Sequence, residues 1–153
     1  MIFDLTILES RLGYSFVDGQ LLVDALTHSS FAYEQDVVTR DNQRLEFLGD
    51  AVLQLVVTEH LYRALQDIPE GDMTKLRAGI VCEPTLALVA ESLDLGSFLR
   101  LGHGEELAGG NKNPSNLSDA VEAVLGAIFY ESGYVAVRDV VLRLFKPFIK
   151  LAC

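Results

Sequence analysis

The sequence lacks the features that mark secreted and membrane proteins. Its two cysteines, Cys82 and Cys153, are too few and too far apart for a disulfide framework, and they fit a reducing compartment. No run approaches the ~20 uninterrupted apolar residues that a membrane span needs. The N-terminus lacks the basic and then apolar order of a signal peptide, because Asp4 and Glu9 interrupt it. We therefore expect a cytoplasmic protein without a membrane segment.

Basic residues are also scarce. The chain has 12 Lys and Arg against 22 Asp and Glu, a formal net charge of −10. A domain that holds nucleic acid by electrostatics alone should be basic, so this balance argues against a simple binding module for RNA or DNA. Divalent cations held by a cluster of carboxylates would reverse the local field and remove this objection.

The composition and the apolar periodicity favour a single all-α domain. With 153 residues and 50% apolar content, the chain is long enough to bury one core. Tryptophan is absent, Leu, Ala and Val dominate, and no strand or internal repeat is evident. The predicted helices cover residues 4–12, 18–26, 42–65, 72–81, 84–96, 116 or 118 to 133, and 135–151. We expect a polar connection at 28–41 and the longest loop at 102–116.

Two carboxylates stand in the long apolar helix predicted at 42–65. Glu46 and Asp50 are four residues apart, so they project from one face. The apolar residues after Asp50 indicate that more than one face of this helix is buried. A carboxylate there is costly unless it is paired, protonated or bound to a metal. Arg44, Arg77 or a backbone donor could satisfy the pair without any function.

A second pair of carboxylates, Asp119 and Glu122, stands three residues apart in another apolar helix. We expect this pair near the first turn, where acidic side chains also serve as caps. Two buried helices can nevertheless bring all four carboxylates together. Oxygen donors without His or Cys suit Mg²⁺ or Mn²⁺. Such ions lower the pKa of an attacking water and stabilise a leaving oxygen, which indicates phosphodiester hydrolysis.

The segment Asn42–Ala51 reads NQRLEFLGDA and closely resembles the signature of the ribonuclease III family. That signature is roughly Asn-Glu-Arg-Leu-Glu-Phe-Leu-Gly-Asp-Ala, and the chain departs from it only at Gln43. The second acidic motif of the family resembles the segment Leu117–Ala127. Thr27–Ser30 and Lys75–Ala78 also look like family segments, in the right order. The resemblance covers essentially the whole chain.

The resemblance implies a homodimeric ribonuclease III endonuclease domain over residues 1–153, with no double-stranded-RNA-binding domain in this chain. It implies cleavage of double-stranded RNA with Mg²⁺, for which Mn²⁺ can substitute, as in the processing of rRNA and mRNA. Each subunit would cut one strand and leave 5′-phosphate and 3′-hydroxyl ends with a short 3′ overhang. Recognition of A-form RNA can rest on its shape, phosphates and 2′-hydroxyls.

The resemblance also implies roles for particular residues. The metal ligands would be Glu46, Asp50, Asp119 and Glu122, with Asp50 and Glu122 also catalytic. The dimer interface would contain Phe47, which enters a socket on the partner subunit, and Gly49. Candidate phosphate contacts are Arg44, Lys75, Arg77 and Lys112. Glu70 is expected near the site, Gln43 removes a charge beside it, and His28, His60 and His103 receive no catalytic role.

Two other functions are consistent with paired acids on helices. A di-iron carboxylate bundle is excluded because that class uses Glu-x-x-His motifs, and no Glu here has a His three residues later. A non-catalytic double-stranded-RNA-binding or processing-partner module of the same fold remains the alternative. The presence of all four carboxylates counts against it, since loss of metal ligands would be the expected mark of such a module.

Overall fold

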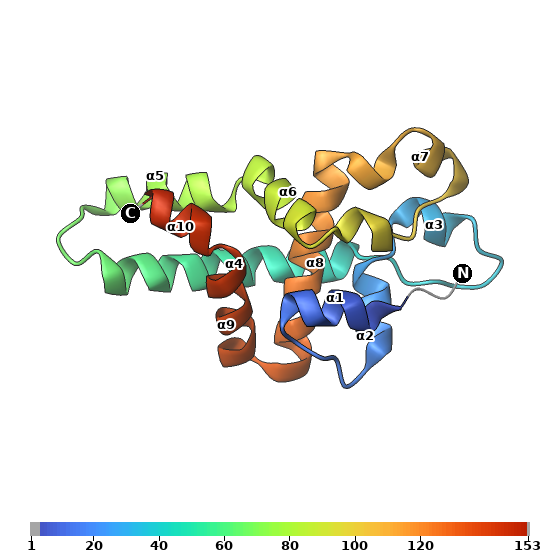
Figure 1. Ribbon diagram of the computed structural model, residues 1–153, viewed down its shortest axis with the longest axis horizontal. Helices are drawn as coiled ribbons and strands as arrows, with labels where there is room; N and C mark the ends of the chain where they lie inside the picture. Colours follow the sequence, from blue (N-terminus) through green and yellow to red (C-terminus); the bar gives the residue numbers. More distant parts are fainter. Residues whose placement is uncertain (1–3, 153) are drawn as a thin grey trace.

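The structure, a computed structural model, describes residues 4–152 and is all-α over this range, as predicted (Figure 1). Cys153 lies outside the described residues. The only β-type pairing in the described range is an isolated bridge between Thr27 and Arg100. The α-helices are α1 (Leu5–Leu12), α2 (Gly19–Ala25), α3 (Ser29–Tyr33), α4 (Gln43–Ala64), α5 (Glu70–Val81), α6 (Glu83–Ser92), α7 (His103–Leu107), α8 (Pro114–Ser132), α9 (Tyr134–Leu144) and α10 (Lys146–Ala152). Two 3₁₀ helices are η1 (Leu95–Phe98) and η2 (Gly110–Lys112). Within residues 4–152, we find no helix with both the length and the apolar character needed to cross a membrane.

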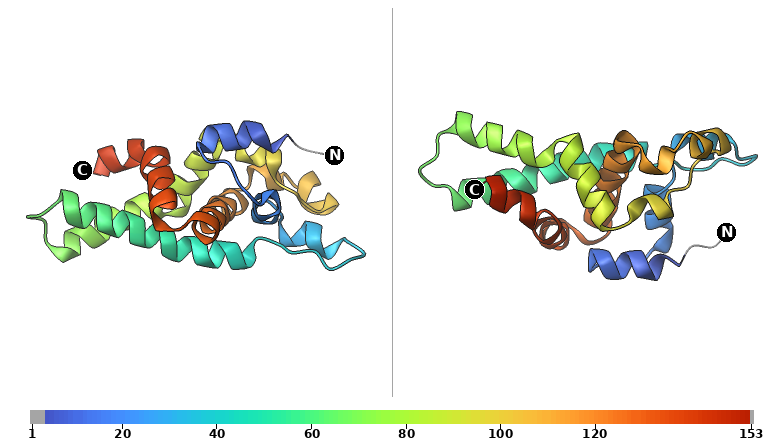
Figure 2. Two further views of the ribbon diagram at one scale, coloured as in Figure 1. Left: turned by 90° about the horizontal axis from the view of Figure 1, so that it is seen from below. Right: turned by 45° about the horizontal axis from the view of Figure 1, so that its top comes forward.

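Helix α8 crosses α4 at the centre of the molecule, and the turned views agree on this contact (Figures 1 and 2). A Cβ atom added at Gly49 would lie 1.6 Å from the carbonyl oxygen of Glu122. One added at Gly126 would lie 2.3 Å from the carbonyl oxygen of Leu45. Only glycine lets the two backbones touch in this way. The close helix contact expected at Gly49 is therefore made by α8 of the same chain.

The core forms around α8, whose side chains are buried on nearly every side between Leu117 and Ile128. Leu53 and Val57 of α4, Val141 of α9 and Phe145 are fully buried against the same core. Burial of apolar surface contributes about 25 cal/mol for each Å² removed from water, which makes this core the main source of stability.

Helix α4 is less buried than predicted. Its inner side holds Leu53 and Val57, but Phe47, Leu55 and Tyr62 are 83%, 56% and 73% exposed. Spacings of eight and seven residues place these three side chains along one side of the helix. The apolar pattern extended over two faces, and only one of them is covered within the subunit.

Several helix ends differ from the predicted ones for local reasons. Helix α8 begins at Pro114, and the side chain of Asn113 accepts hydrogen bonds from the backbone N–H groups of the two residues after it. Part of the predicted loop at 102–116 forms α7 and η2. The last predicted helix is divided at Phe145 into α9 and α10, because Pro147 lacks an N–H group and its ring clashes with a continuing helix. Helix α5 begins at Glu70, two residues before the predicted start.

Candidate active site

The crossing of α4 and α8 brings the four predicted carboxylates together. Glu46 and Asp50 project from the N-terminal half of α4, and Asp119 and Glu122 project from α8. Carboxylate oxygens of Glu46, Asp119 and Glu122 all lie within 4.8 Å of one another. Asp50 is more exposed and joins them through a side-chain hydrogen bond with Glu122. We refer to these four side chains as the carboxylate cluster.

Asp119 and Glu122 do not cap the helix that carries them. Since α8 begins at Pro114, they lie in its second and third turns rather than near its first. The free N–H groups of the first turn are satisfied by Asn113 instead. The interpretation of this pair as structural caps is therefore wrong, because the helix starts earlier than the sequence pattern predicts.

No arginine neutralises the carboxylate cluster. The ion pairs among residues 4–152 join Arg63 to Glu59 and Arg138 to Asp139, both far from the cluster in sequence. Arg77 donates a hydrogen bond to the Thr58 hydroxyl at 2.9 Å, and Arg44 is exposed to solvent. The alternative in which Arg44 or Arg77 pairs with the acids of α4 is therefore not supported.

In the absence of metal, bound protons reduce the repulsion among the four carboxylates of the cluster. Burial raises the pKa of Glu122 to about 8, and the hydrogen bond with Asp50 raises it further in the same direction. Burial and then the charge of Asp119 raise the pKa of Glu46 to about 7. Burial also raises the pKa of Asp119, although its hydrogen bond with Glu46 opposes this shift. Glu46, with its hydrogen bond to Asp119, and Glu122, with its hydrogen bond to Asp50, are therefore the members of the cluster that take up protons most readily near neutral pH.

Three residues that the sequence analysis did not select also act on the cluster. The charge of Asp41, just before α4, helps to raise the pKa of Glu46. Glu83, the first residue of α6, has the same effect on Asp119, whereas His28 opposes it. Asp41 is next to α4 in the chain, but no spacing rule could have found Glu83 or His28, which come from other segments and reach the cluster through packing such as that of α6 on α8.

The predicted RNA contacts are scattered over three elements. Arg44 lies on α4, Lys75 and Arg77 lie on α5, and Lys112 lies on η2. Arg44, Lys75 and Lys112 are exposed, whereas Arg77 is half-buried against α4. Glu70, at the start of α5, accepts a hydrogen bond from the Thr74 hydroxyl and is not among the acids that shift the pKa values of the cluster.

The raised pKa values predict that the metal-free protein loses stability as the pH rises. Glu46 and Glu122 move from an ordinary pKa of 4.5 to about 7 and about 8, so between these limits the folded chain binds more protons than the unfolded chain. Stability must then fall from about pH 4.5 to about pH 8. Thermal unfolding in EDTA at a series of pH values would measure this. The isosteric Glu122→Gln variant should show a flatter profile, and equal slopes for both proteins would contradict the assignment.

The chain matches the Ribonuclease-III-like family over residues 18–148. It is 52% identical over 145 residues to Ribonuclease 3 of Caldanaerobacter subterraneus subsp. tengcongensis, an alignment that covers 95% of this chain and 64% of the relative. It is also 52% identical over 145 residues to Ribonuclease 3 of Streptomyces coelicolor, covering 95% of this chain and 52% of that protein. The chain thus spans between half and two thirds of the length of these two relatives.

Solved structures agree with the sequence relatives. Two structures of the nuclease domain of ribonuclease III from Campylobacter jejuni are 45% identical to this chain, with TM-scores of 0.90 and 0.88. The first covers 96% of this chain and 99% of the solved one, and it is described as showing structural flexibility in a region involved in dimer formation. The match over most of the chain in sequence and in fold confirms the resemblance seen in the signature. This chain belongs to the ribonuclease III family.

Proposed function

We propose that residues 1–153 form an endonuclease domain that hydrolyses the phosphodiester bonds of double-stranded RNA. The observation that carries this proposal is the carboxylate cluster at the crossing of α4 and α8. Its ligands are all oxygen atoms, which favours a hard divalent cation over zinc or copper. Products with 5′-phosphate and 3′-hydroxyl ends and a short 3′ overhang follow from the family resemblance.

The cluster fits a Mg²⁺ or Mn²⁺ ion. Opposite ligand oxygens of an octahedral Mg²⁺ site are about 4.2 Å apart, so small movements of Glu46, Asp119 and Glu122 would place all three on one ion. Asp50 would hold Glu122 in place or complete the coordination. The bound metal would lower the pKa of the attacking water and stabilise the leaving oxygen. Glu46 and Glu122 must release their protons to bind it, so metal binding should strengthen as the pH rises.

We further propose that the domain acts as a homodimer through the exposed side of α4. Phe47 is 83% exposed and lies in line with Leu55 and Tyr62, which gives an apolar stripe without a partner inside the subunit. Apolar and aromatic anchors of this kind are typical of interface centres. A dimer would present two carboxylate clusters to one duplex, with one cluster for each strand.

We propose that exposed basic side chains of this chain contact the phosphates of the RNA. Arg44, Lys75 and Lys112 are exposed and could reach a duplex, whereas Arg77 would have to leave its contact with Thr58. Because the chain carries a net charge of −10, we expect binding to rely on divalent ions and to weaken steeply with salt. Duplex RNA as the substrate, together with the free thiol of Cys82, favours the cytoplasm as its location.

The decisive experiment is incubation of the chain with a long RNA duplex, with Mg²⁺ or with excess EDTA. We expect cutting only with the metal, and end analysis should show 5′-phosphates. A single strand of the same sequence controls for substrate choice, and Glu122→Gln protein prepared in parallel controls for contaminating nucleases. Persistent duplex cleavage in EDTA would refute the metal-dependent mechanism. Absence of any cleavage with Mg²⁺ or Mn²⁺ would favour the non-catalytic binding module.

Truncation of Phe47 should weaken the dimer. Loss of a buried aromatic anchor costs about 2 kcal/mol or more of association free energy, so Phe47→Ala should shift the sedimentation profile toward the monomer. Tyr130→Ala is a matched control, since Tyr130 is 72% exposed and lies on α8 rather than α4. A wild-type chain that sediments as a monomer at micromolar concentration would contradict the proposed assembly.

A further inference from the structure

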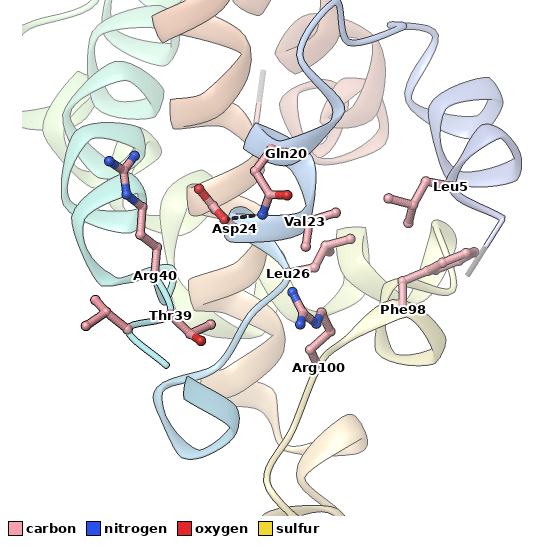
Figure 3. A pocket seen from close by; sticks show the side chains of 10 residues that line it. Leu5, Gln20, Val23, Asp24, Leu26, Thr39, Arg40, Phe98 and Arg100 are labelled. Atoms are coloured by element: carbon pink, nitrogen blue, oxygen red, sulfur yellow. Dashed lines mark hydrogen bonds between the residues drawn. The ribbon is translucent and has the colours of Figure 1, made fainter. Parts of the chain in front are cut away.

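A cavity of about 670 Å³ lies beside α2 (Figure 3). None of the four cluster residues lines it. Its walls combine apolar side chains, among them Leu26 and Phe98, with an acid, an amide and two guanidinium groups. The volume is in the range of small-molecule sites, which pair apolar walls with a few polar groups.

Asp24 is the most unusual residue of this cavity. The residue is only 8% exposed, and a buried carboxylate is costly unless its oxygens are satisfied. Among the described residues it accepts one side-chain hydrogen bond, from Gln20 Nε2 to its Oδ1 at 2.8 Å, drawn as a dashed line in Figure 3. A carboxylate offers about four acceptor positions. No buried side-chain oxygen within residues 4–152 lacks a hydrogen-bond partner, so Oδ2 is open to solvent and available to a ligand. The second N–H of Gln20 is available as a donor beside it.

Two arginines line the same cavity without neutralising Asp24. Neither Arg40 nor Arg100 forms an ion pair with a carboxylate in residues 4–152. Arg100 is held in place, because its Nη1 donates to the Thr27 hydroxyl at 3.2 Å and its guanidinium lies 4.2 Å from the centre of the Phe31 ring. Arg40 is exposed, and Figure 3 shows its side chain on the opposite side of Asp24 from Phe98.

We propose that this cavity binds a phosphorylated guanosine, either as the free nucleotide or within an RNA strand. The Watson–Crick edge of guanine presents two adjacent N–H donors, which match the carboxylate of Asp24, and a carbonyl oxygen that matches the free amide N–H of Gln20. Proteins read single nucleotides through this edge while apolar, aromatic or guanidinium surfaces hold the faces of the base. Arg40, which is exposed and forms no ion pair within residues 4–152, supplies the charge for the phosphate. Adenine and cytosine place a ring-nitrogen acceptor against the carboxylate, and uracil has only one donor.

Calorimetric titration of the chain in EDTA tests the proposal without any cleavage. We expect 5′-GMP to bind, and AMP, CMP and UMP to bind about tenfold or more weakly, because a site built to pair with donors rejects ligands that lack them. Asp24→Asn should abolish the preference for GMP over AMP. Arg40→Ala, a change at an exposed residue, should weaken binding of GMP more than binding of guanosine.

Two further measurements are needed. One tells whether the ligand is a free nucleotide or part of an RNA strand, and the other tests the guanosine site separately from the proposed nuclease activity. The first measurement uses a four-nucleotide RNA single strand with one G, and the same strand with A in place of G as the control. If only the G-containing strand binds more tightly than GMP, the ligand is part of an RNA strand. Equal binding of GMP and the strand would identify the free nucleotide. Wild-type protein that does not bind GMP, or that binds AMP equally well, would overturn the inference. Asp24→Asn should still cleave duplex RNA with Mg²⁺, so failure here leaves the nuclease proposal intact.

Discussion

Replacement of Glu122 by alanine should reduce cleavage of duplex RNA by about a hundredfold or more. Mutation of a residue that only orients a metal ligand typically costs 10–100-fold in metal affinity or activity. Glu122 is proposed as a ligand itself, so its loss should cost at least as much. It shares the 4.8 Å cluster with Glu46 and Asp119 and holds Asp50 by a hydrogen bond. Its loss therefore disturbs all the other members of the cluster.

The same variant should keep or gain stability in the absence of metal. Above about pH 8, where Glu122 is charged, burial and the neighbouring carboxylates destabilise it, and alanine removes that penalty, so the gain should be largest at alkaline pH. Thermal unfolding in EDTA and cleavage with Mg²⁺ measure the two effects separately. Glu91→Ala, at an exposed glutamate of α6, is the control and should change neither. Wild-type cleavage by Glu122→Ala would remove this residue from the site, and an unfolded variant would show that its role is structural.

Gly49→Ala should cause the largest loss of folding stability of any change proposed here. The new Cβ would lie 1.6 Å from the Glu122 carbonyl oxygen and 3.0 Å from the Gly126 amide nitrogen. These are backbone atoms, so the clash is relieved only if α4 and α8 move apart. Overpacking in a well-packed core typically costs 1–3 kcal/mol, and we expect about 3 kcal/mol or more here because no side chain can turn away. Cleavage should fall as well, since both helices carry the cluster.

Gly79→Ala provides the matched control for this change. Gly79 also lies inside a helix, α5, but a Cβ there would meet no atom within 4 Å. Alanine is favoured over glycine in a helix interior by about 0.5–1 kcal/mol, so this variant should be slightly more stable than the wild type. Urea unfolding of the three proteins gives the comparison. Gly49→Ala protein as stable as Gly79→Ala would contradict the close contact of α4 and α8.

Periodicity alone predicted much of the candidate site. Spacings of four and three place Glu46 with Asp50, and Asp119 with Glu122, on single helix faces, and the geometry of an α-helix requires this wherever the helices lie. The all-α fold class also followed from local pattern and composition, and the structure confirms it. The signature at Asn42–Ala51 indicated the family, and the comparisons confirm it.

Tertiary packing decided what lies against each face. A helical pattern shows that residues share a side but not what covers that side. Gly49 therefore suggested a close contact without revealing that the contact is α8 of the same chain. The apolar pattern around Phe47 did not show that the subunit leaves this face open, and only the family resemblance pointed that way. The contributions of Glu83 to the cluster and of Arg100 to the cavity beside Asp24 depend on segments far apart in sequence. Charges interact through space, and only the folded chain determines those distances.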